Sequence, residues 1–242
     1  MQAVDMNIDY TIIRSNKRKT IALQIKNNQV IVRAPNSISP EYIELLVKQK
    51  SAWIVKKLSY QNRGKAPIPP TYLPDSSLLI YGTEKKLCIH FQRNPNDNQV
   101  TITENEIHIS LALIAERKSH DSSYLSAQIK KQLAKWFKAK AQYYLSFRLV
   151  ELSSQLNITP VSYQVKRYKA RWGSCNNKHE LSFNYLLVMA PAWVFDYVII
   201  HELCHIKHLN HSSTFWALVE QHMPNYLQAN QWLKQNQAKM HW

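Results

Sequence analysis

The feature that most constrains the fold of this chain is a pair of histidines, His201 and His205, that stand four positions apart. On an α-helix, four residues advance about 40° beyond one full turn, so the two imidazoles emerge on one face and can share an ion. Glu202 lies about 100° around the same helix, where its carboxylate reaches a water molecule on that ion. The pattern therefore predicts a helix that carries a hydrolytic zinc site.

The other residues of this helix indicate that it packs between a hydrophobic core and a cleft. Its apolar side chains cluster at about 140° to 300° from His201 on a helical wheel. This apolar set consists of Ile199, Ile200, Leu203, Cys204 and Ile206. A His and Glu face opposite such an apolar face is typical of a metal site and rarely of histidines satisfied inside a core. Cys204 is therefore expected to be a buried, inert thiol.

Catalytic zinc takes three protein ligands, and several residues compete to be the third. His211 is the first choice, because its spacing from His201 matches the long HExxHxxGxxH motif, in which the chain turns back toward the ion. His208 stands where the motif usually has its turn glycine, and it is either a rival ligand or a hydrogen-bond donor that orients a ligand. Asn210 tolerates the left-handed backbone that such a turn uses. Glu220 is the remaining candidate, since shorter zincin motifs recruit a glutamate from a following helix.

A hydrolase of this kind also needs a group that stabilises the oxyanion and a surface that receives the substrate. The candidates for the oxyanion are Arg171, Asn184, Tyr185 and His222. The strand expected at 181–188 borders the cleft, either as an edge on which an extended peptide pairs or as a covered internal strand.

Charge and cysteine usage narrow the partners and the compartment. Thirty-one Lys and Arg against sixteen Asp and Glu give a net charge of +15, which either serves solubility or attracts nucleic acids, nucleotides or acidic proteins. The three cysteines lie far apart and form no CxxC pair, which argues against a disulfide framework and fits a reducing compartment. Without a signal peptide or an apolar stretch long enough to cross a bilayer, we expect a cytoplasmic protein with no membrane association.

The first half of the chain is predicted to be rich in β-structure. Residues 8–34 alternate like a hairpin, and one helix follows from Ser39 and Pro40 through Leu58. Residues 61–77 contain one glycine and four prolines, which predicts a linker and a domain boundary. Three further runs resemble strands: 78–81, 87–91 and 100–113, the last broken by a turn at 104–105. We assign 1–115 to a β-rich N-terminal region with one helix.

The second half is predicted to be mainly helical. A long amphipathic helix begins at Asp121, and its lysines form a solvated face or an anion-binding one. Alternating residues at 161–168 and 181–188 predict a β-hairpin, which is followed by the metal-binding helix over 192–209 and by two shorter helices separated near Pro224. The expected fold is α+β, with a zincin-like catalytic domain over 116–242.

Several motifs, in order along the chain, resemble the YgjP-like metal-dependent hydrolases, a group of zincins distantly related to SprT-type proteases. The matching segments are 171–175 (RWGSC), 181–185 (LSFNY), 196–198 (DYV), 201–205 (HELCH), 210–212 (NHS) and 215–216 (FW). Residues 14–25, 30–35 and 53–54 also look like the opening of that family, whereas 61–160 carries little of the resemblance.

The resemblance implies a gluzincin-like core with His201, His205 and His211 as Zn²⁺ ligands and Glu202 as general base. The predicted function is a zinc-dependent metallopeptidase acting on a peptide. The alternative function is that of a nucleoside triphosphate pyrophosphatase, whose substrate is an anionic small molecule. The sequence has no P-loop glycines and no acidic Mg²⁺ cluster, which argues against it. A third possibility is a DNA-associated protease or binding module whose basic residues 14–19 contact phosphates.

Overall fold

A computed structural model describes residues 8–26, 28–63, 72–94 and 99–240, and it divides the chain into two compact units, Met1–Ile68 and Pro69–Trp242. Each unit has its own cluster of buried hydrophobic side chains. The division falls inside the proline-rich segment 61–77, where the sequence predicted a boundary. The predicted limit at residue 115 instead falls within the second unit, because the strands before it and the long helix after it share one core.

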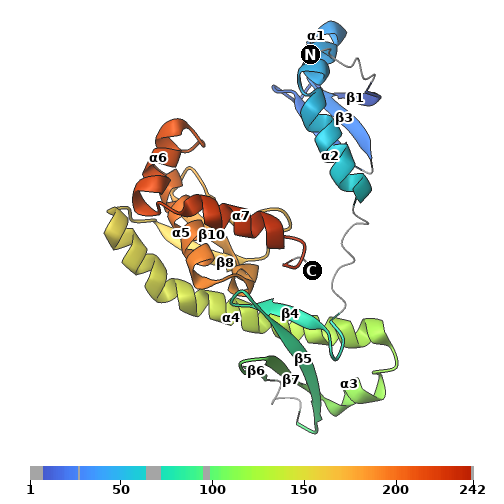
Figure 1. Cartoon of the computed structure of the whole chain (residues 1–242), viewed down its shortest axis with the longest axis vertical. Helices are drawn as coiled ribbons and strands as arrows, with labels where there is room; N and C mark the ends of the chain where they lie inside the picture. Colours follow the sequence, from blue (N-terminus) through green and yellow to red (C-terminus); the bar gives the residue numbers. More distant parts are fainter. Residues whose placement is uncertain (1–7, 27, 64–71, 95–98, 241–242) are drawn as a thin grey trace. The chain divides into compact units, whose positions relative to one another are not determined.

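The first unit is a three-stranded sheet with two helices (Figure 1). Its elements are β1 (Tyr10–Arg14), β2 (Ala22–Lys26), β3 (Gln29–Ala34), α1 (Pro40–Gln49) and α2 (Ser51–Arg63). Strands β2 and β3 form an antiparallel pair, but β1 pairs with β3 in parallel, so the basic turn after β1 closes no hairpin. The predicted single helix is two helices, separated at Lys50, and Ser39 caps the first of them as expected.

The second unit begins with a four-stranded sheet in the order β4-β5-β7-β6. The strands are β4 (Ser77–Ile80), β5 (Thr83–Gln92), β6 (Val100–Ile102) and β7 (Glu106–Ala112), and α3 (Leu113–Arg117) follows. The antiparallel pairing of β6 with β7 confirms the hairpin predicted around 104–105. Strands β5 and β7 are neighbours and run parallel, with Cys88 opposite His108.

The long helix α4 (Ser122–Leu156) runs along this unit, from the four-stranded sheet to the elements of the last third of the chain (Figure 1). Asp121 caps it by accepting hydrogen bonds from the backbone N–H groups of Ser123 and Tyr124, and Asn157 ends it in a left-handed conformation. Thirty-five residues at 1.5 Å each make it about 52 Å long. Among the described residues, no helix combines the length and the apolar composition needed to cross a bilayer.

The last third of the chain forms a second small sheet and three helices. These elements are β8 (Ser162–Lys166), β9 (Gly173–Cys175), β10 (Glu180–Asn184), the 3₁₀ helix η2 (Tyr185–Met189), α5 (Ala192–Lys207), α6 (Ser213–His222) and α7 (Tyr226–Asn236). The predicted hairpin is wrong, because β8 and β10 pair in parallel and the short strand β9 adds to the free side of β10. The α+β class is confirmed.

Two sets of contacts fix η2 and the following helix α5 within the second unit. At the β4–β5 turn, Tyr81 and Gly82 donate backbone hydrogen bonds to Val188 and Met189 of η2, at 3.0 and 2.9 Å. In the C-terminal third of α4, Arg148 makes a two-pronged ion pair with Asp196 of α5, with N–O distances of 3.0 and 2.8 Å.

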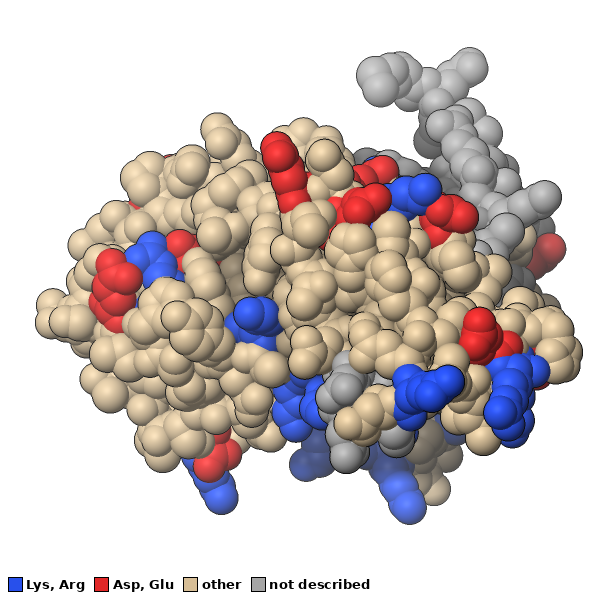
Figure 2. All heavy atoms as spheres, turned by 90° about the horizontal axis from the view of Figure 1, so that it is seen from below, with Lys and Arg blue, Asp and Glu red and all other residues tan. Residues whose placement is uncertain are grey.

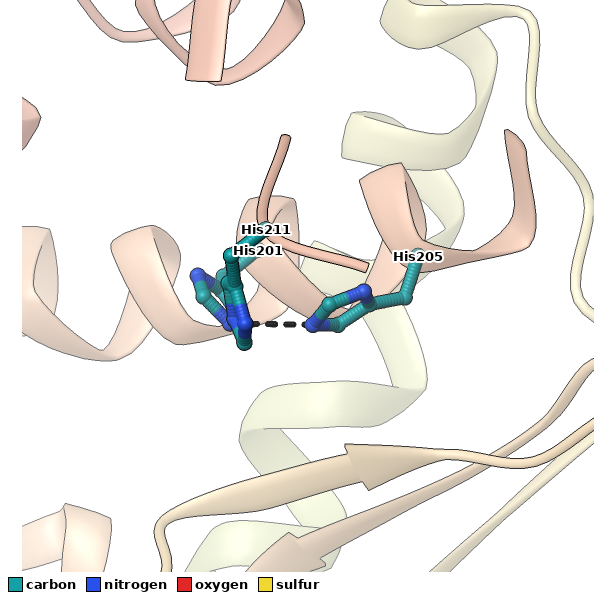
Figure 3. A group of neighbouring side chains, drawn as sticks. All are labelled: His201, His205 and His211. Atoms are coloured by element: carbon teal, nitrogen blue, oxygen red, sulfur yellow. Dashed lines mark hydrogen bonds between the residues drawn. The ribbon is translucent and has the colours of Figure 1, made fainter. Parts of the chain in front are cut away.

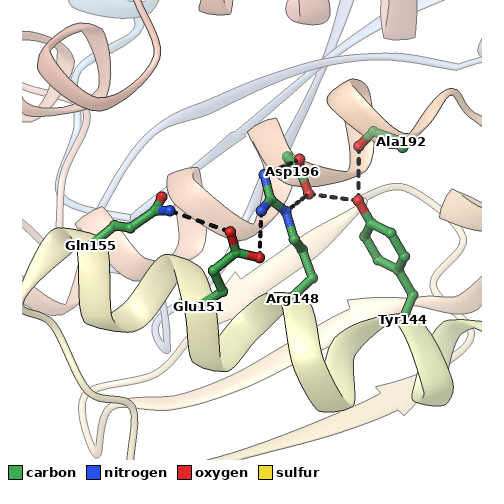
Figure 4. A network of polar contacts seen from close by, with 6 residues as sticks. All are labelled: Tyr144, Arg148, Glu151, Gln155, Ala192 and Asp196. Carbon is green, nitrogen blue, oxygen red and sulfur yellow. Dashed lines mark hydrogen bonds and ion pairs between the residues drawn. The ribbon is translucent and has the colours of Figure 1, made fainter.

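Neighbouring residues of α4 extend this ion pair into a network (Figure 4). Tyr144 donates to the Asp196 carboxylate at 2.7 Å, and Glu151 lies 2.6 Å from the Arg148 guanidinium. A bidentate pair fixes direction as well as distance, so this network sets the position of α5 about one and a half turns before His201.

Candidate metal centre

The structure brings His201, His205 and His211 together at one point (Figure 3). The first two project from α5, and the third comes from the turn before α6, which begins where Ser212 accepts a hydrogen bond from the backbone of Phe215. The Nε2 atom of His201 lies 3.2 Å from that of His205 and 3.1 Å from that of His211. Two nitrogens bound at about 2.1 Å to a tetrahedral ion lie about 3.4 Å apart, so the spacing suits one shared ion.

The hydrogen bond of His205 and the burial of His201 fit a metal ion as well. Nδ1 of His205 lies 3.0 Å from the carbonyl oxygen of His208, and because a carbonyl only accepts, Nδ1 carries the proton and Nε2 a lone pair. Nδ1 of His201 is buried and has no hydrogen-bond partner among the described residues. Burial, with smaller effects from His205 and His211, lowers the pKa of His201 to about 3. Neutral imidazoles with converging lone pairs are the form that ligates metals.

Two aromatic residues of α6 hold the imidazoles in place. Phe215 is fully buried, and its ring centroid lies 4.5 to 5.0 Å from those of all three histidines. Trp216 stacks on His211, with centroids 5.5 Å apart and planes at 25°. These contacts restrict the ring orientations, which is what a preorganised ligand set requires.

Glu202 is buried beside the histidines, with 5% of its surface exposed. Burial raises the pKa of its carboxyl to about 8, and Arg171 opposes the shift. Strand β9 lies directly against this side chain, since a Cβ atom on Gly173 would stand 2.5 Å from Oε1. A carboxyl that is desolvated and held next to a cavity suits proton transfer near neutral pH.

A cavity of about 560 Å³ opens over the histidines and Glu202. Its walls come from the segment that includes β9, from α5 and from the region of α7. Besides the three histidines and Glu202, it is lined by residues 170–175, Tyr197, Val198, Leu209, Asn230, Leu233, Lys234 and Gln237. The cavity therefore has both apolar and cationic walls.

Of the four residues predicted to stabilise an oxyanion, Arg171 lines the cavity. Asn184 has a supporting position, because its side-chain amide donates to the backbone carbonyls of Tyr168 and Arg171 at 3.1 and 3.2 Å. Tyr185 is buried in the core, and His222 is not part of the cavity lining. The loop that carries Arg171 is thus held by Asn184.

The rival third ligands lie elsewhere. His208 ends α5 and contributes its backbone carbonyl to His205, while its imidazole is not part of the three-histidine group. Glu220 is exposed on α6 and does not line the cavity. Asn210 is absent from the described residues with positive φ, so the turn before His211 needs no left-handed residue. Cys204 is fully buried, as predicted.

Several cavity residues were not anticipated. Tyr197 stands one helical turn before His201, so the helical wheel contained enough information to find it. Asn230, Lys234 and Gln237 lie in or just after α7, and they reach the cavity only because α7 packs on α5. No local pattern announces such a contact.

Three converging imidazoles and a buried carboxylate lie together at one cavity wall, which is the arrangement expected of a metal-dependent hydrolase. The YgjP-like family model, described as a metallopeptidase domain, matches residues 19–236, and the chain therefore belongs to the YgjP-like family. The resemblance noted in the sequence is confirmed. No curated protein and no solved structure matches the chain.

Proposed function

We propose that this protein is a zinc metallopeptidase in which His201, His205 and His211 hold the ion and Glu202 is the general base. The observation that carries the proposal is the convergence of three Nε2 atoms beside a buried carboxyl at the wall of one cavity. Membership in a metallopeptidase family supports a peptide as the substrate.

A zinc ion in this position supplies a Lewis acid that polarises a carbonyl, and its charge draws the raised pKa of a neighbouring carboxyl downward. Glu202 accepts the proton of the attacking water and returns it to the leaving amine. Burial against β9 keeps its carboxylate in one position during both transfers.

Tyr197 and Arg171 are the groups of this chain best placed to stabilise the negative charge that develops on the carbonyl oxygen. Burial, and to a smaller extent Glu202, raises the pKa of the Tyr197 phenol to about 12, so this group remains a hydrogen-bond donor at neutral pH. Arg171 contributes a cation at the cavity wall, and its guanidinium packs over the ring of Tyr168 at 5.5 Å.

The substrate peptide is proposed to bind along β9. Strand β10 is internal, between β8 and β9, so of the two alternatives predicted for 181–188 the covered internal strand is the one that the structure has, and it offers no free edge to a peptide. Strand β9 lies at the edge of this sheet and its three residues line the cavity. An extended segment that adds to β9 would run directly past Glu202.

A nucleotide remains the second candidate substrate because of the net charge of +15 and the cationic Arg171 and Lys234 at the cavity. On the face drawn in Figure 2, however, acidic side chains lie among the basic ones. Whether the substrate is a peptide or a nucleotide is therefore tested by the assay below. Binding of nucleic acid stays a prediction.

The zinc-loaded protein should be assayed against a mixed peptide library and against nucleoside triphosphates, beside Glu202→Gln and the matched control Glu220→Gln. We expect peptides to be cleaved by the wild type and by the control, with a loss of at least about 100-fold in Glu202→Gln at unchanged zinc content. Cleavage of nucleotides without peptides would replace the peptidase proposal by the phosphohydrolase. Full peptide cleavage by Glu202→Gln would remove this residue as the base.

The ligand set has its own test in His211→Ala, with His208→Ala as the control on the same turn. Loss of one of three ligands is expected to release most of the zinc at this site, whereas the control keeps it, because only the backbone of His208 contacts the site. Equal zinc content in the two variants, measured by elemental analysis, would show that His211 is not a ligand.

A further inference from the structure

A second group of metal-binding residue types lies on the sheet at the other end of α4, apart from the catalytic cavity. Strands β5 and β7 are parallel neighbours in which Cys88 stands opposite His108 and Lys86 opposite Glu106. Alternate residues such as Leu87, Ile107 and Ile109 point into the core and are fully or almost fully buried. Cys88, Glu106 and His108 therefore share the outer face, where each is half-buried.

The donor atoms of these three residues are close together. The Cys88 sulfur, a Glu106 carboxylate oxygen and a His108 ring nitrogen all lie within 4.8 Å of one another. Nε2 of His108 is 3.1 Å from Oε2 of Glu106, close to the separation of about 3.3 Å expected for two ligands on one tetrahedral zinc ion. Cys88 is a free thiol, so its sulfur is available.

His90 supports His108 from its other side. Its Nε2 atom lies 3.0 Å from Nδ1 of His108, and the two rings stack with centroids 5.2 Å apart. When a histidine binds a metal through Nε2, its Nδ1–H needs an acceptor, and metal-bound histidines almost always have one. The tautomer of His90 with its proton on Nδ1 would fill that role through Nε2.

The charges around the group also favour a cation. Glu106 contributes one negative charge, and Cys88 contributes another once it is deprotonated on binding. The nearest lysine on this face, Lys86, forms an ion pair with Asp75 at 2.8 Å, so its positive charge is offset. A sulfur, a nitrogen and a carboxylate oxygen form a donor set that zinc accepts and that magnesium and calcium do not prefer.

We propose that Cys88, Glu106 and His108 form a second binding site, for a divalent ion of the zinc class, with His90 as a positioning residue for His108. None of the four lines the catalytic cavity. The ion would join the two central strands of the sheet that packs on α4, and solvent would complete its coordination on the exposed side. This proposal is independent of the peptidase proposal.

The test uses the full-length protein, freed of metal by chelation and then loaded with Co²⁺ or Zn²⁺. Wild type is expected to bind two ions per chain, and Cys88→Ser and His108→Ala one each. The cobalt form of the wild type should show the near-ultraviolet charge-transfer band of a thiolate ligand, and this band should vanish in Cys88→Ser. His201→Ala should also bind one ion but keep the band, which separates the two sites.

Two variants serve as matched controls. Cys175→Ser removes the other half-buried cysteine, and Ser110→Ala changes another residue on the outer face of β7. Both variants should keep two ions and the thiolate band. His90→Ala is expected to weaken the second site by about 10- to 100-fold, and His90→Gln to restore most of the affinity, because its amide oxygen accepts the Nδ1–H of His108. A wild type with one ion and no thiolate band would overturn the proposal and leave His90, His108 and Glu106 as a hydrogen-bonded chain only.

Discussion

The contact between Gly173 and Glu202 allows a test of how the proposed general base is held. A Cβ atom at position 173 would stand 2.5, 2.7 and 2.8 Å from Oε1, Cγ and Cδ of Glu202, whereas ordinary contacts begin at 3.4 Å. In Gly173→Ala the carboxylate and the strand must therefore separate by about 0.9 Å. Glu202 has little room to yield, because it is 5% exposed and lies on a helix fixed to α4.

Two magnitudes follow from this displacement. Overpacking of a close-packed site costs about 1–3 kcal/mol, which for a unit of this size lowers the melting temperature by roughly 3–9 °C. A shift of about 1 Å in a catalytic group lowers the rate by about 100-fold. Zinc content should stay unchanged, because the three atoms nearest to the added Cβ all belong to Glu202 and none to a histidine.

The assay combines thermal unfolding, elemental analysis and kcat/KM on a peptide that the wild type cleaves. The double variant Gly173→Ala with Glu202→Asp shortens the side chain and should recover part of the lost stability, which a double-mutant cycle measures as coupling. Wild-type stability and activity within twofold in Gly173→Ala would refute the conclusion that β9 positions Glu202.

Three further predictions concern the scaffold and the ion. Asp196→Asn should lower the free energy of unfolding by about 1–2 kcal/mol in urea titrations, a range that allows for the partial exposure of Arg148. Glu151→Gln changes an exposed partner of Arg148 and should lower it by less than about 0.5 kcal/mol. Equal effects of the two variants would contradict the assigned network. Residues 69–242 expressed alone should unfold cooperatively and keep the metal, because they contain the larger core and the whole candidate site. Compared with the full-length protein, calorimetry should show that only the unfolding transition of the first unit is missing. Removal of metal by a chelator should lower the melting temperature of 69–242, by the equivalent of about 2.7 kcal/mol for an ion present at 100 times its Kd, and zinc should restore it; an unchanged transition would speak against a bound ion.

The features that could be predicted from the sequence are those encoded by local spacing and local chemistry. The cap at Ser39, the helix that carries His201 and His205, and the proline-rich boundary each depend on residues close together in the chain. The motif also predicted the meeting of His211 with the two helical histidines, because only one short turn separates them.

The features that could not be predicted depend on partners distant in the chain. Alternation at 161–168 and 181–188 indicates strands but does not say which strands pair or in which direction, so the sequence predicts a hairpin where the structure has a parallel pair. Strand β9 has three residues, too few for a period to show, although its Gly173 lies against Glu202. Lys234 reaches the cavity through the packing of α7 on α5, which leaves no trace in local sequence.

The most direct test of the central claim is anomalous X-ray diffraction at the zinc edge from crystals of the zinc-loaded protein. We predict a strong peak within bonding distance of the Nε2 atoms of His201, His205 and His211, next to the carboxylate of Glu202. A peak that lacks one of these imidazoles, or no peak at this position in protein that elemental analysis shows to contain zinc, would contradict the assignment.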